Sequence, residues 1–384
     1  MKLLQFTVFL ILLSLIACTP GKDKTEKQET SFKLLENSYN TRYSSKFRID
    51  EFGEFTKATV LTPWPGSNQN FTYFFVSKSS DIDIPANAGD VIIRTPVESI
   101  VCFSTTHLPY LEMMGEENKL TGFPTTSLIC SQAIRDRVEK GKVVDLGPSN
   151  EVNIETVIDL SPEMIVAFSM GDDIGMIKKL QVSGIPVVLN ADYLENHPLG
   201  RAEWIRFMSL FFEKEKIADS IFLNIERSYL ALKHKTDQIT DRPTVLSGIV
   251  YGDTWFLPGG RNYGARFIQD AGGRYPWSDN NSVESLQLSF ESVFEKAHNA
   301  DLWINVATYD TKQALISSDA RYGEFGAYKN NMLFNYTARI SGKGGNEFFE
   351  KGYARPDIIL SDLVKIFHPD LMKDYNLYFY RKLE

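Results

Sequence analysis

A short segment occurs twice in this chain, and this repeat constrains the possible folds more than any other feature. Ile154-Glu155-Thr156-Val157-Ile158 is matched by Phe290-Glu291-Ser292-Val293-Phe294. After a few polar residues, each copy is followed by an apolar run typical of a buried strand, at residues 164–167 and 302–306. Each copy predicts a short helix with a glutamate in its first turn, where the helix dipole favours a carboxylate. We therefore expect two similar lobes, each with a similarly placed negative charge.

The size and charge of the chain set further limits. The 384 residues, 43% of them hydrophobic, are enough for about two domains with a substantial core. The net charge is −8 and the pI is about 5.4. Such a chain offers no basic face to displace counterions from nucleic acid, so we expect no nucleic-acid partner.

The first residues indicate the cellular compartment. Lys2 precedes an apolar run at residues 3–16, which is shorter than the about 20 residues of a membrane span. The run ends in Leu15-Ile16-Ala17-Cys18, which resembles the bacterial lipobox. The resemblance implies a signal peptide at residues 1–17 and acylation of Cys18, and hence a lipoprotein anchored in the bacterial cell envelope and facing the periplasm. The alternative is an uncleaved anchor helix.

Two regions with different patterns follow. Residues 18–30 are polar and charged and predict a solvated tether. Residues 31–95 contain runs of strand composition, such as 47–49 and 71–76, separated by turn-forming glycines and prolines. They predict a small β appendage.

The rest of the chain has an α/β pattern. In an N-terminal lobe at residues 96–200 we expect strands at 100–103, 142–146, 164–168 and 186–189, and a helix at 172–182. Residues 201–240 predict linker helices, with an apolar stripe formed by Ile217, Ile221, Ile225, Tyr229 and Leu232. In a C-terminal lobe at residues 241–384 we expect strands at 244–250 and 302–306, and helices at 265–271 and 357–367.

These regions together predict an α/β fold of two Rossmann-like lobes joined by one long rigid helix. Ligands of open α/β sheets bind beyond the carboxyl ends of the strands. Two such lobes that face each other enclose a cleft, and a rigid connecting helix predicts that the cleft is largely preformed.

This arrangement resembles the helical-backbone (class III) periplasmic binding proteins of ABC importers, which capture ferric siderophores, haem and cobalamin. The resemblance covers about residues 97–370. It rests on Val97-Glu98-Ser99-Ile100-Val101-Cys102-Phe103-Ser104, on Leu120-Thr121-Gly122-Phe123, on the run from Asp145-Leu146-Gly147 to Met164-Ile165-Val166, and on Asp270-Ala271-Gly272-Gly273. The β appendage lies outside the common module and resembles an extension of Bacteroidetes-type lipoprotein members.

The resemblance implies a docking function for the repeated glutamates. In the family, one glutamate in each lobe binds arginines of the membrane permease, and the matching positions here are Glu155 and Glu291. Exposed carboxylates on rigid helix starts are suited to charge-assisted pairs with arginine. The alternative is that both residues only stabilise their helices. The chain departs from the family in the helix expected after the first strand, where relatives often carry an acidic residue and this chain has Leu108-Pro109-Tyr110-Leu111-Glu112. Contacts that relatives make there do not transfer.

Candidate ligand contacts lie on loops that follow the strands. These loops span residues 104–107, 148–150 and 169–173 in the first lobe, and 253–263, 308–310 and 341–348 in the second. Trp255 and Tyr309 are expected to stack on a ligand ring, and Arg261 to bind a carboxylate or an anionic ferric complex. The full set of expected ligand-binding residues is Thr106, His107, Ser149, Trp255, Arg261, Tyr309 and Asn346. An ordinary surface-loop side chain is the alternative at each position.

The cysteines and histidines argue against a resident metal. Cys102 lies in an apolar run, so a buried free thiol is expected, with a Cys102–Cys130 disulfide as the alternative. The five histidines have no chelating spacing, so we expect no bound metal or cofactor of the protein's own. His107 remains a candidate for contact with a metal centre in the ligand.

The sequence therefore predicts a monomeric substrate-binding lipoprotein of an ABC importer that captures a ferric siderophore. Cobalamin and haem are alternative ligands, and a non-transport surface lipoprotein is an alternative of a different class. An enzyme is not expected, because the chain has no Gly-x-Ser-x-Gly motif and Glu155 and Glu291 belong on outer helix starts.

Overall fold

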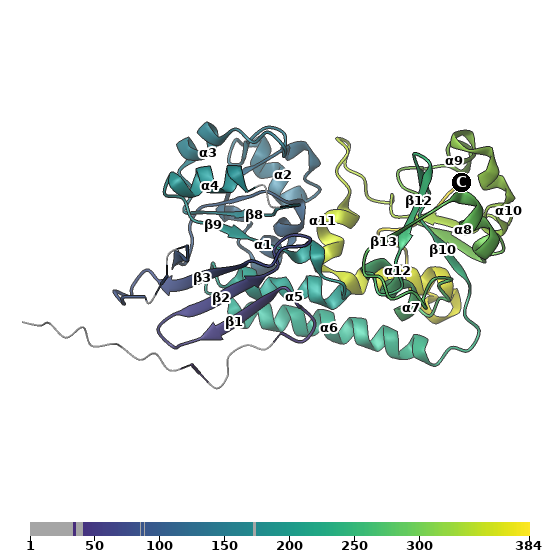
Figure 1. The fold of residues 1–384 in the computed structure, drawn as a ribbon, viewed down its shortest axis with the longest axis horizontal. Helices are drawn as coiled ribbons and strands as arrows, with labels where there is room; N and C mark the ends of the chain where they lie inside the picture. Colours follow the sequence, from purple (N-terminus) through teal and green to yellow (C-terminus); the bar gives the residue numbers. More distant parts are fainter. Residues whose placement is uncertain (1–33, 36–40, 85, 88, 172–173) are drawn as a thin grey trace, which may run out of the picture. The chain divides into compact units, whose positions relative to one another are not determined.

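A computed structural model describes residues 34–35, 41–84, 86–87, 89–171 and 174–384 (Figure 1). The predicted signal peptide at residues 1–17, the lipidation site Cys18 and the tether at residues 18–30 lie outside the described residues. Among the described residues, no helix has both the length and the apolar composition needed to cross a bilayer.

The first sheet has four strands in the order β1-β2-β3-β4 and is drawn in purple and blue in Figure 1. Strands β1 to β3 pair antiparallel, and β3 and β4 pair parallel. Side chains of β1 and β3 pack against α5, where the rings of Phe47 and Trp204 are 4.9 Å apart. The Leu189 N–H also donates to the Tyr73 hydroxyl (2.9 Å), so this sheet is joined to the second one. The bounds are β1 (Phe47–Glu51), β2 (Thr56–Leu61), β3 (Asn70–Ser77) and β4 (Val91–Thr95).

The second sheet is the centre of what we call the N-lobe. Its five strands are all parallel, in the order β7-β6-β5-β8-β9. The chain order reverses between β5 and β8, which makes the carboxyl ends of these two strands a topological switch point. The strands are β5 (Ile100–Cys102), β6 (Leu120–Phe123), β7 (Val144–Asp145), β8 (Met164–Ala167) and β9 (Val187–Leu189).

Helices lie between the N-lobe strands, as expected of parallel pairing. Successive residues of β5 face opposite sides of the sheet. Ile100 and Cys102 belong to one buried hydrophobic cluster, and Val101 and Phe103 belong to the other. The helices are α1 (Leu108–Met114), α2 (Gln132–Glu139), α3 (Ile154–Leu160) and α4 (Gly175–Val182), with short 3-10 helices η1 (Thr105–His107), η2 (Glu117–Lys119), η3 (Thr126–Leu128) and η4 (Asp192–Leu194).

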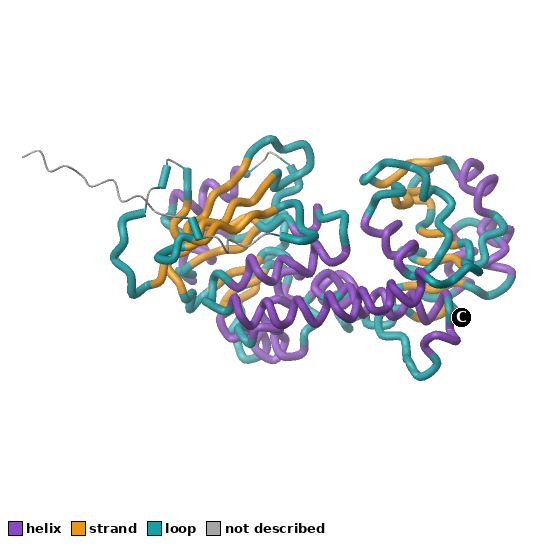
Figure 2. Tube along the Cα trace, turned by 90° about the horizontal axis from the view of Figure 1, so that it is seen from below, coloured by secondary structure: helices purple, strands orange, loops and turns teal. Residues whose placement is uncertain are grey.

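Two helices, α5 (Pro198–Ser209) and α6 (Glu215–Asp237), connect the N-lobe to the remaining sheets and contact each other. Helix α6 is the longest helix in Figure 2. At about 1.5 Å per residue, its 23 residues span about 35 Å. This helix confirms the predicted long linker.

The buried face of α6 differs in part from the predicted stripe. Ile225 and Tyr229 are buried as expected, but Ile217 is 43% exposed. Ala218 and Phe222 are buried instead. Residues 218, 222, 225 and 229 follow the helical period, so the prediction of Ile217 was wrong by one residue of register.

The C-lobe contains two sheets. In the first, β10, β14 and β15 pair parallel and β16 closes the edge antiparallel. The second sheet is antiparallel, in the order β11-β12-β13. The bounds are β10 (Val245–Ser247), β14 (Leu302–Ile304), β15 (Leu333–Asn335), β16 (Arg381–Lys382), β11 (Val250–Tyr251), β12 (Thr254–Pro258) and β13 (Ser285–Leu288).

Helices of the C-lobe connect these strands, and α12 also contacts α6. They are α7 (Tyr263–Asp270), α8 (Phe290–Ala297), α9 (Lys312–Ser318), α10 (Gly326–Lys329), α11 (Glu347–Ala354) and α12 (Pro356–Phe367), with 3-10 helices η5 (Ala320–Glu324) and η6 (Pro369–Met372). Parallel sheets with crossover helices in both lobes confirm the predicted α/β class. The residue limits assigned to each region from the sequence remain predictions.

Candidate functional site

A cavity of about 470 Å³ lies beyond the carboxyl ends of β5, β14 and β15. Thr105 and Leu128 of the N-lobe border it together with residues of the C-lobe. This is the side of open α/β sheets on which ligands bind. Thr105 lies three residues after the end of the switch-point strand β5. The lining residues are Thr105, Leu128, Ala307, Thr308, Asp310, Tyr336, Thr337, Ile340, Gly344, Gly345, Asn346 and Phe349.

The loop after β14 reaches the cavity in an uncommon backbone conformation. Asn305 and Ala307 both have a positive φ, of 62° and 52°. The Asn335 amide, buried at the end of β15, donates to the carbonyl oxygens of Ala307 and Tyr309 (both 2.9 Å). Left-handed conformations of residues other than glycine persist only where the surroundings hold them and are common at ligand sites. The side chain on β15 therefore fixes the loop that presents Thr308 and Asp310.

The segment between β15 and α11 covers another side of the cavity. Its glycine-rich stretch ends at Gly345, where a side chain would collide with the backbone oxygen of Leu128 in the N-lobe. Asn346 then caps α11, because its Oδ1 accepts from the Phe348 N–H (2.9 Å). The close approach of Gly345 to Leu128 brings the two lobes together at the cavity edge.

Helix α11 also connects the lobes below the cavity. Glu350 is 2% exposed and accepts from the N–H groups of Cys130 (2.7 Å) and Ser131 (2.9 Å). Burial raises the pKa of Glu350 to about 7. These contacts couple α11, which carries the cavity residues Asn346 and Phe349, to the N-lobe.

A buried arginine makes a further contact between elements near α11. The Arg201 guanidinium of α5 lies 3.6 Å from the ring centre of Tyr263 and 4.1 Å from that of Tyr353. Its N–H groups donate to the carbonyl oxygens of Glu195 and Tyr193. Tyr263 belongs to α7 and Tyr353 to α11, so this cation holds two C-lobe helices against α5.

The structure brings few of the predicted ligand contacts to this cavity. Asn346 lines it. Thr106 and His107 follow the lining residue Thr105, but His107 has no exposed surface, and no described residue bonds its ring nitrogens. Burial lowers the pKa of His107 to about 3, so the ring is neutral. The His107 ring has no exposed atom, because η1 directs it into the interior. The predicted contact of His107 with a metal centre in the ligand is therefore not supported.

Trp255 is also buried, with no exposed surface. Its ring stacks on Trp303 at 5.6 Å, and its indole N–H donates to the Ser247 carbonyl oxygen (3.2 Å). The residue alternates with exposed Phe256 on β12, so the strand pleat directs the indole into the core. The prediction that Trp255 stacks on a ligand is therefore wrong, and the residue packs in the core.

The other predicted contacts are not among the residues that line this cavity. Ser149 and Arg261 are exposed and do not line it, and Tyr309 is half-buried between the lining residues Thr308 and Asp310. Hydrogen bonds from Gly259 and Arg261 to carbonyl oxygens of residues 284 and 282 fix the loop that carries Arg261. The predicted loop at residues 169–173 is described only as far as Gly171.

The repeated segments form helices of the same design, α3 and α8. The Asn153 side chain accepts from the Thr156 N–H (3.0 Å) at the start of α3, and the Ser289 side chain accepts from the Ser292 N–H (3.2 Å) at the start of α8. Glu155 and Glu291 are in the first turns and are exposed. One apolar residue of each segment, Val157 or Val293, is completely buried. The predicted glutamate-bearing helices are confirmed.

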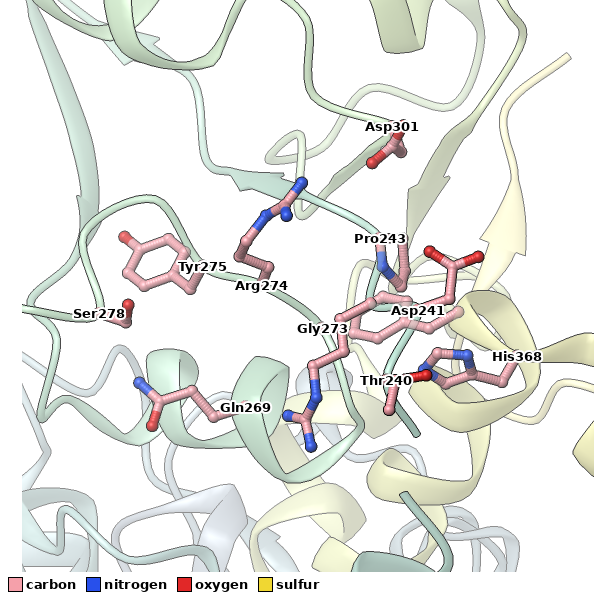
Figure 3. A pocket seen from close by; sticks show the side chains of 12 residues that line it. Thr240, Asp241, Pro243, Gln269, Gly273, Arg274, Tyr275, Ser278, Asp301 and His368 are labelled. Carbon is pink, nitrogen blue, oxygen red and sulfur yellow. The ribbon is translucent and has the colours of Figure 1, made fainter. Parts of the chain in front are cut away.

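A second, larger cavity of about 1010 Å³ lies at the opposite edge of the C-lobe sheet (Figure 3). It borders the amino ends of β10 and β14, and several of its polar groups bind neighbouring residues of the fold. The Arg274 guanidinium donates to the Thr244 hydroxyl, and Asp301 accepts from the Thr244 N–H (2.7 Å). Because ligands of such sheets bind at the carboxyl edge, its size alone does not make this cavity the ligand site.

Comparison with known proteins agrees with this geometry. Residues 100–340 match the sequence profile of a family described as periplasmic binding protein, which covers more than half of the chain. The chain belongs to this family. The matched region begins after β4, so the four-stranded sheet precedes the family module.

Individual relatives of this periplasmic binding protein extend the comparison. An uncharacterized lipoprotein from Methanocaldococcus jannaschii is 24% identical over 99% of this chain and 96% of its own length, so its alignment includes the four-stranded sheet. A possible iron-binding periplasmic protein from Staphylococcus epidermidis has a TM-score of 0.56 at 16% identity, over 71% of this chain and 99% of its own. The haem-binding protein HutB of Vibrio cholerae has a TM-score of 0.54 at 16% identity, over 68% of this chain and 99% of its own.

Several cavity residues of this periplasmic binding protein were not anticipated from its sequence. Leu128, Tyr336, Ile340 and Phe349 line the cavity, and β15, which ends just before Tyr336, was not predicted. The apolar run of β15 was the available signal, since loops after such strands form ligand sites. The two cysteines among the described residues, Cys102 and Cys130, are free, as expected, and Cys102 is buried. No group of three or more potential metal ligands is present among the described residues.

Proposed function

We propose that this periplasmic binding protein captures an iron complex, a ferric siderophore, between its lobes and delivers it to the permease of an ABC importer. The cavity at the carboxyl ends of β5, β14 and β15 carries the proposal, because both lobes border it and its volume of about 470 Å³ is within the usual range for small-molecule sites. Haem and cobalamin remain the alternative ligands.

Docking onto the permease is proposed to use Glu155 and Glu291. Both carboxylates are exposed at the starts of α3 and α8, where they are available for charge-assisted hydrogen bonds with arginines of a partner. The resemblance of the N-terminus to the lipobox supports acylation of Cys18 and attachment to a membrane of the cell envelope, facing the periplasm. A monomer is the proposed state.

Native mass spectrometry of the protein purified from its own host tests this function. The expected result is a mass increase equal to that of an iron complex, together with a rise in Tm when the ligand-free protein receives the same complex. A non-transport surface lipoprotein is the competing function. The proposal fails if the purified protein carries no small molecule and neither ferric siderophores, haemin nor cyanocobalamin raises its Tm.

A further inference from the structure

The cavity between the lobes has an unusual charge composition for a site that would receive an anionic complex. Asp310 is the one acidic residue among the described residues that line it, and none of these is Lys, Arg or His. Burial raises the pKa of the lining residue Tyr336, so its phenol is neutral. The wall therefore contributes one carboxylate, and the Arg381 guanidinium lies 3.4 Å from it.

The same wall is apolar where a ligand would touch it. Leu128, Ile340 and Phe349 are 37%, 46% and 44% exposed, although each is a large hydrophobic residue. They come from both lobes and all line this cavity. The ring of Tyr336 meets that of Phe349 edge-on, with centroids 5.1 Å apart. Contiguous exposed apolar surface inside a cavity indicates a ligand with apolar surface of its own.

One hydroxyl in the wall lacks a partner. Thr337 is 8% exposed, and its Oγ1 has no hydrogen-bond partner among the described residues. A buried polar atom without a partner is costly, and a ligand group that bonds to it removes that cost. Because this oxygen has almost no exposed surface, a ligand group bonds to it only when the Thr337 side chain rotates toward the cavity.

Three cations near the cavity have partners within the fold. The Arg339 guanidinium lies 3.8 Å from the ring centre of Tyr378, and its Nη1 is 3.7 Å from Glu347. Lys351 donates to the Tyr378 hydroxyl (2.8 Å), and Arg381 lies 3.4 Å from the Asp310 carboxylate itself. An anionic ligand in the cavity would thus lose its hydration without gaining a cationic partner from the wall.

We propose that this cavity selects neutral or cationic metal complexes with an apolar surface and discriminates against anionic ones. The apolar surface of the complex covers Leu128, Ile340 and Phe349, a polar atom bonds to the Thr337 hydroxyl, and a positive group faces Asp310. This selectivity rests on the proposed function as a receptor for an iron complex. Ferric hydroxamates have this chemistry, whereas ferric tris-catecholates and haem with its propionates do not.

Isothermal titration calorimetry of the full chain with three probes tests the selectivity. The probes are the cationic ferrioxamine B, the neutral ferrichrome and the anionic ferric enterobactin. We expect Kd values for the first two that are at least about tenfold lower than for the third. Equal or tighter binding of ferric enterobactin overturns the selectivity but leaves the proposed function intact. If neither these probes nor haemin or cyanocobalamin binds, the proposed function fails and the selectivity with it.

Two variants separate the roles of the wall residues. Asp310→Asn is expected to weaken ferrioxamine B by about twofold and to leave ferrichrome unchanged, since only the cation loses an attraction and Arg381 already offsets part of it. Asp374→Asn, at an exposed position that does not line the cavity, is the control and should change neither. An equal loss for both probes in Asp310→Asn contradicts the assignment of Asp310.

Thr337→Val removes the hydroxyl at nearly constant shape. We expect it to weaken both hydroxamate probes by about threefold while Tm stays equal or rises, because the hydroxyl has no partner in the fold to lose. Unchanged affinity, or a lowered Tm with unchanged affinity, shows that the hydroxyl does not bind the ligand.

Discussion

The two glutamate-bearing helices have the same construction but different surroundings. Helices α3 and α8 each begin with a side-chain cap, carry a first-turn glutamate and bury one valine completely. No described residue forms an ion pair with Glu155. Glu291 instead lies 3.3 Å from Arg321, whose guanidinium also binds Asp319 (2.7 Å) and covers the ring of Phe290 at 4.0 Å.

This difference shows that a repeated segment preserves position but not electrostatics. The cap and the buried valine are local and fix where each carboxylate sits. The neighbouring arginine comes from η5, which has no counterpart in the repeated segment, and it partly neutralises Glu291. If both carboxylates dock onto a permease, Glu155 offers a full charge, and Glu291 must share its charge with Arg321.

Removal of both carboxylates gives the largest expected effect. The double variant Glu155→Ala with Glu291→Ala should abolish uptake, a loss of at least about a hundredfold, because both proposed arginine contacts are gone. Ligand Kd should be unchanged, since neither residue lines the cavity. Transport assays and calorimetry measure the two quantities.

The control is a double variant in the same two helices that removes the same number of negative charges. Asp159 and Glu295 are exposed acids further along α3 and α8. Asp159→Ala with Glu295→Ala should transport normally. Normal uptake by the Glu155/Glu291 variant would remove the docking assignment.

The single variants test whether the two glutamates contribute unequally to docking. We expect Glu155→Ala to reduce the uptake rate by about thirtyfold and Glu291→Ala by about fivefold. The second effect is smaller because the Glu291 carboxylate already pairs with Arg321. In an Arg321→Ala background, loss of Glu291 should become as severe as loss of Glu155. Equal effects of the two single variants in the wild-type background would show that Arg321 does not weaken the docking function of Glu291.

A buried carboxylate between the lobes provides the contrast to these exposed ones. Burial raises the pKa of Glu350 from 4.5 to about 7. Between these values the folded protein keeps a proton that the unfolded chain has lost, so stability decreases as pH rises through this window. We expect the free energy of unfolding to fall by on the order of 1 kcal/mol more in the wild type than in Glu350→Gln between pH 5 and pH 7.

Urea denaturation of both proteins across this pH range measures the Glu350 effect. Below pH 4.5 the residue is protonated in both states, so wild type and variant should there share one pH dependence. Identical pH dependence above pH 5 would mean that Glu350 is ionised in the folded protein throughout.

The caps give the smallest expected effect and test the equality of the two helices. Asn153→Ala and Ser289→Ala should each lower the free energy of unfolding by about 0.5 to 1 kcal/mol, because each removes the side-chain acceptor of one first-turn N–H group. Chemical denaturation measures both. A cost in one lobe and none in the other would show that the repeated segments are not energetically equivalent.

Local patterns in the sequence were sufficient for much of the fold. Apolar runs located β5, β8, β9 and β14 to within two residues, and the helical period located α6. These signals are strong because a buried parallel strand and a long amphipathic helix each need many apolar residues in sequence. The repeat itself identified α3 and α8 and the exposure of their glutamates.

The binding cavity depended on information that no short segment contains. Trp255 is a residue type that often stacks on ligands. Because β12 pairs with β13, its side chain points into the core instead. Gly345 meets Leu128 across more than two hundred residues of sequence, and β15 places Tyr336 and Thr337 at the cavity.

By itself, the sequence determined the fold class, the long linker and the two acidic helix starts, because periodicity and caps act over a few residues. Tertiary structure alone decided which side chains reach the cavity, that its wall is apolar with one carboxylate, and that Arg321 distinguishes Glu291 from Glu155. The physical reason is that burial and charge pairing depend on strand order and on contacts between distant segments.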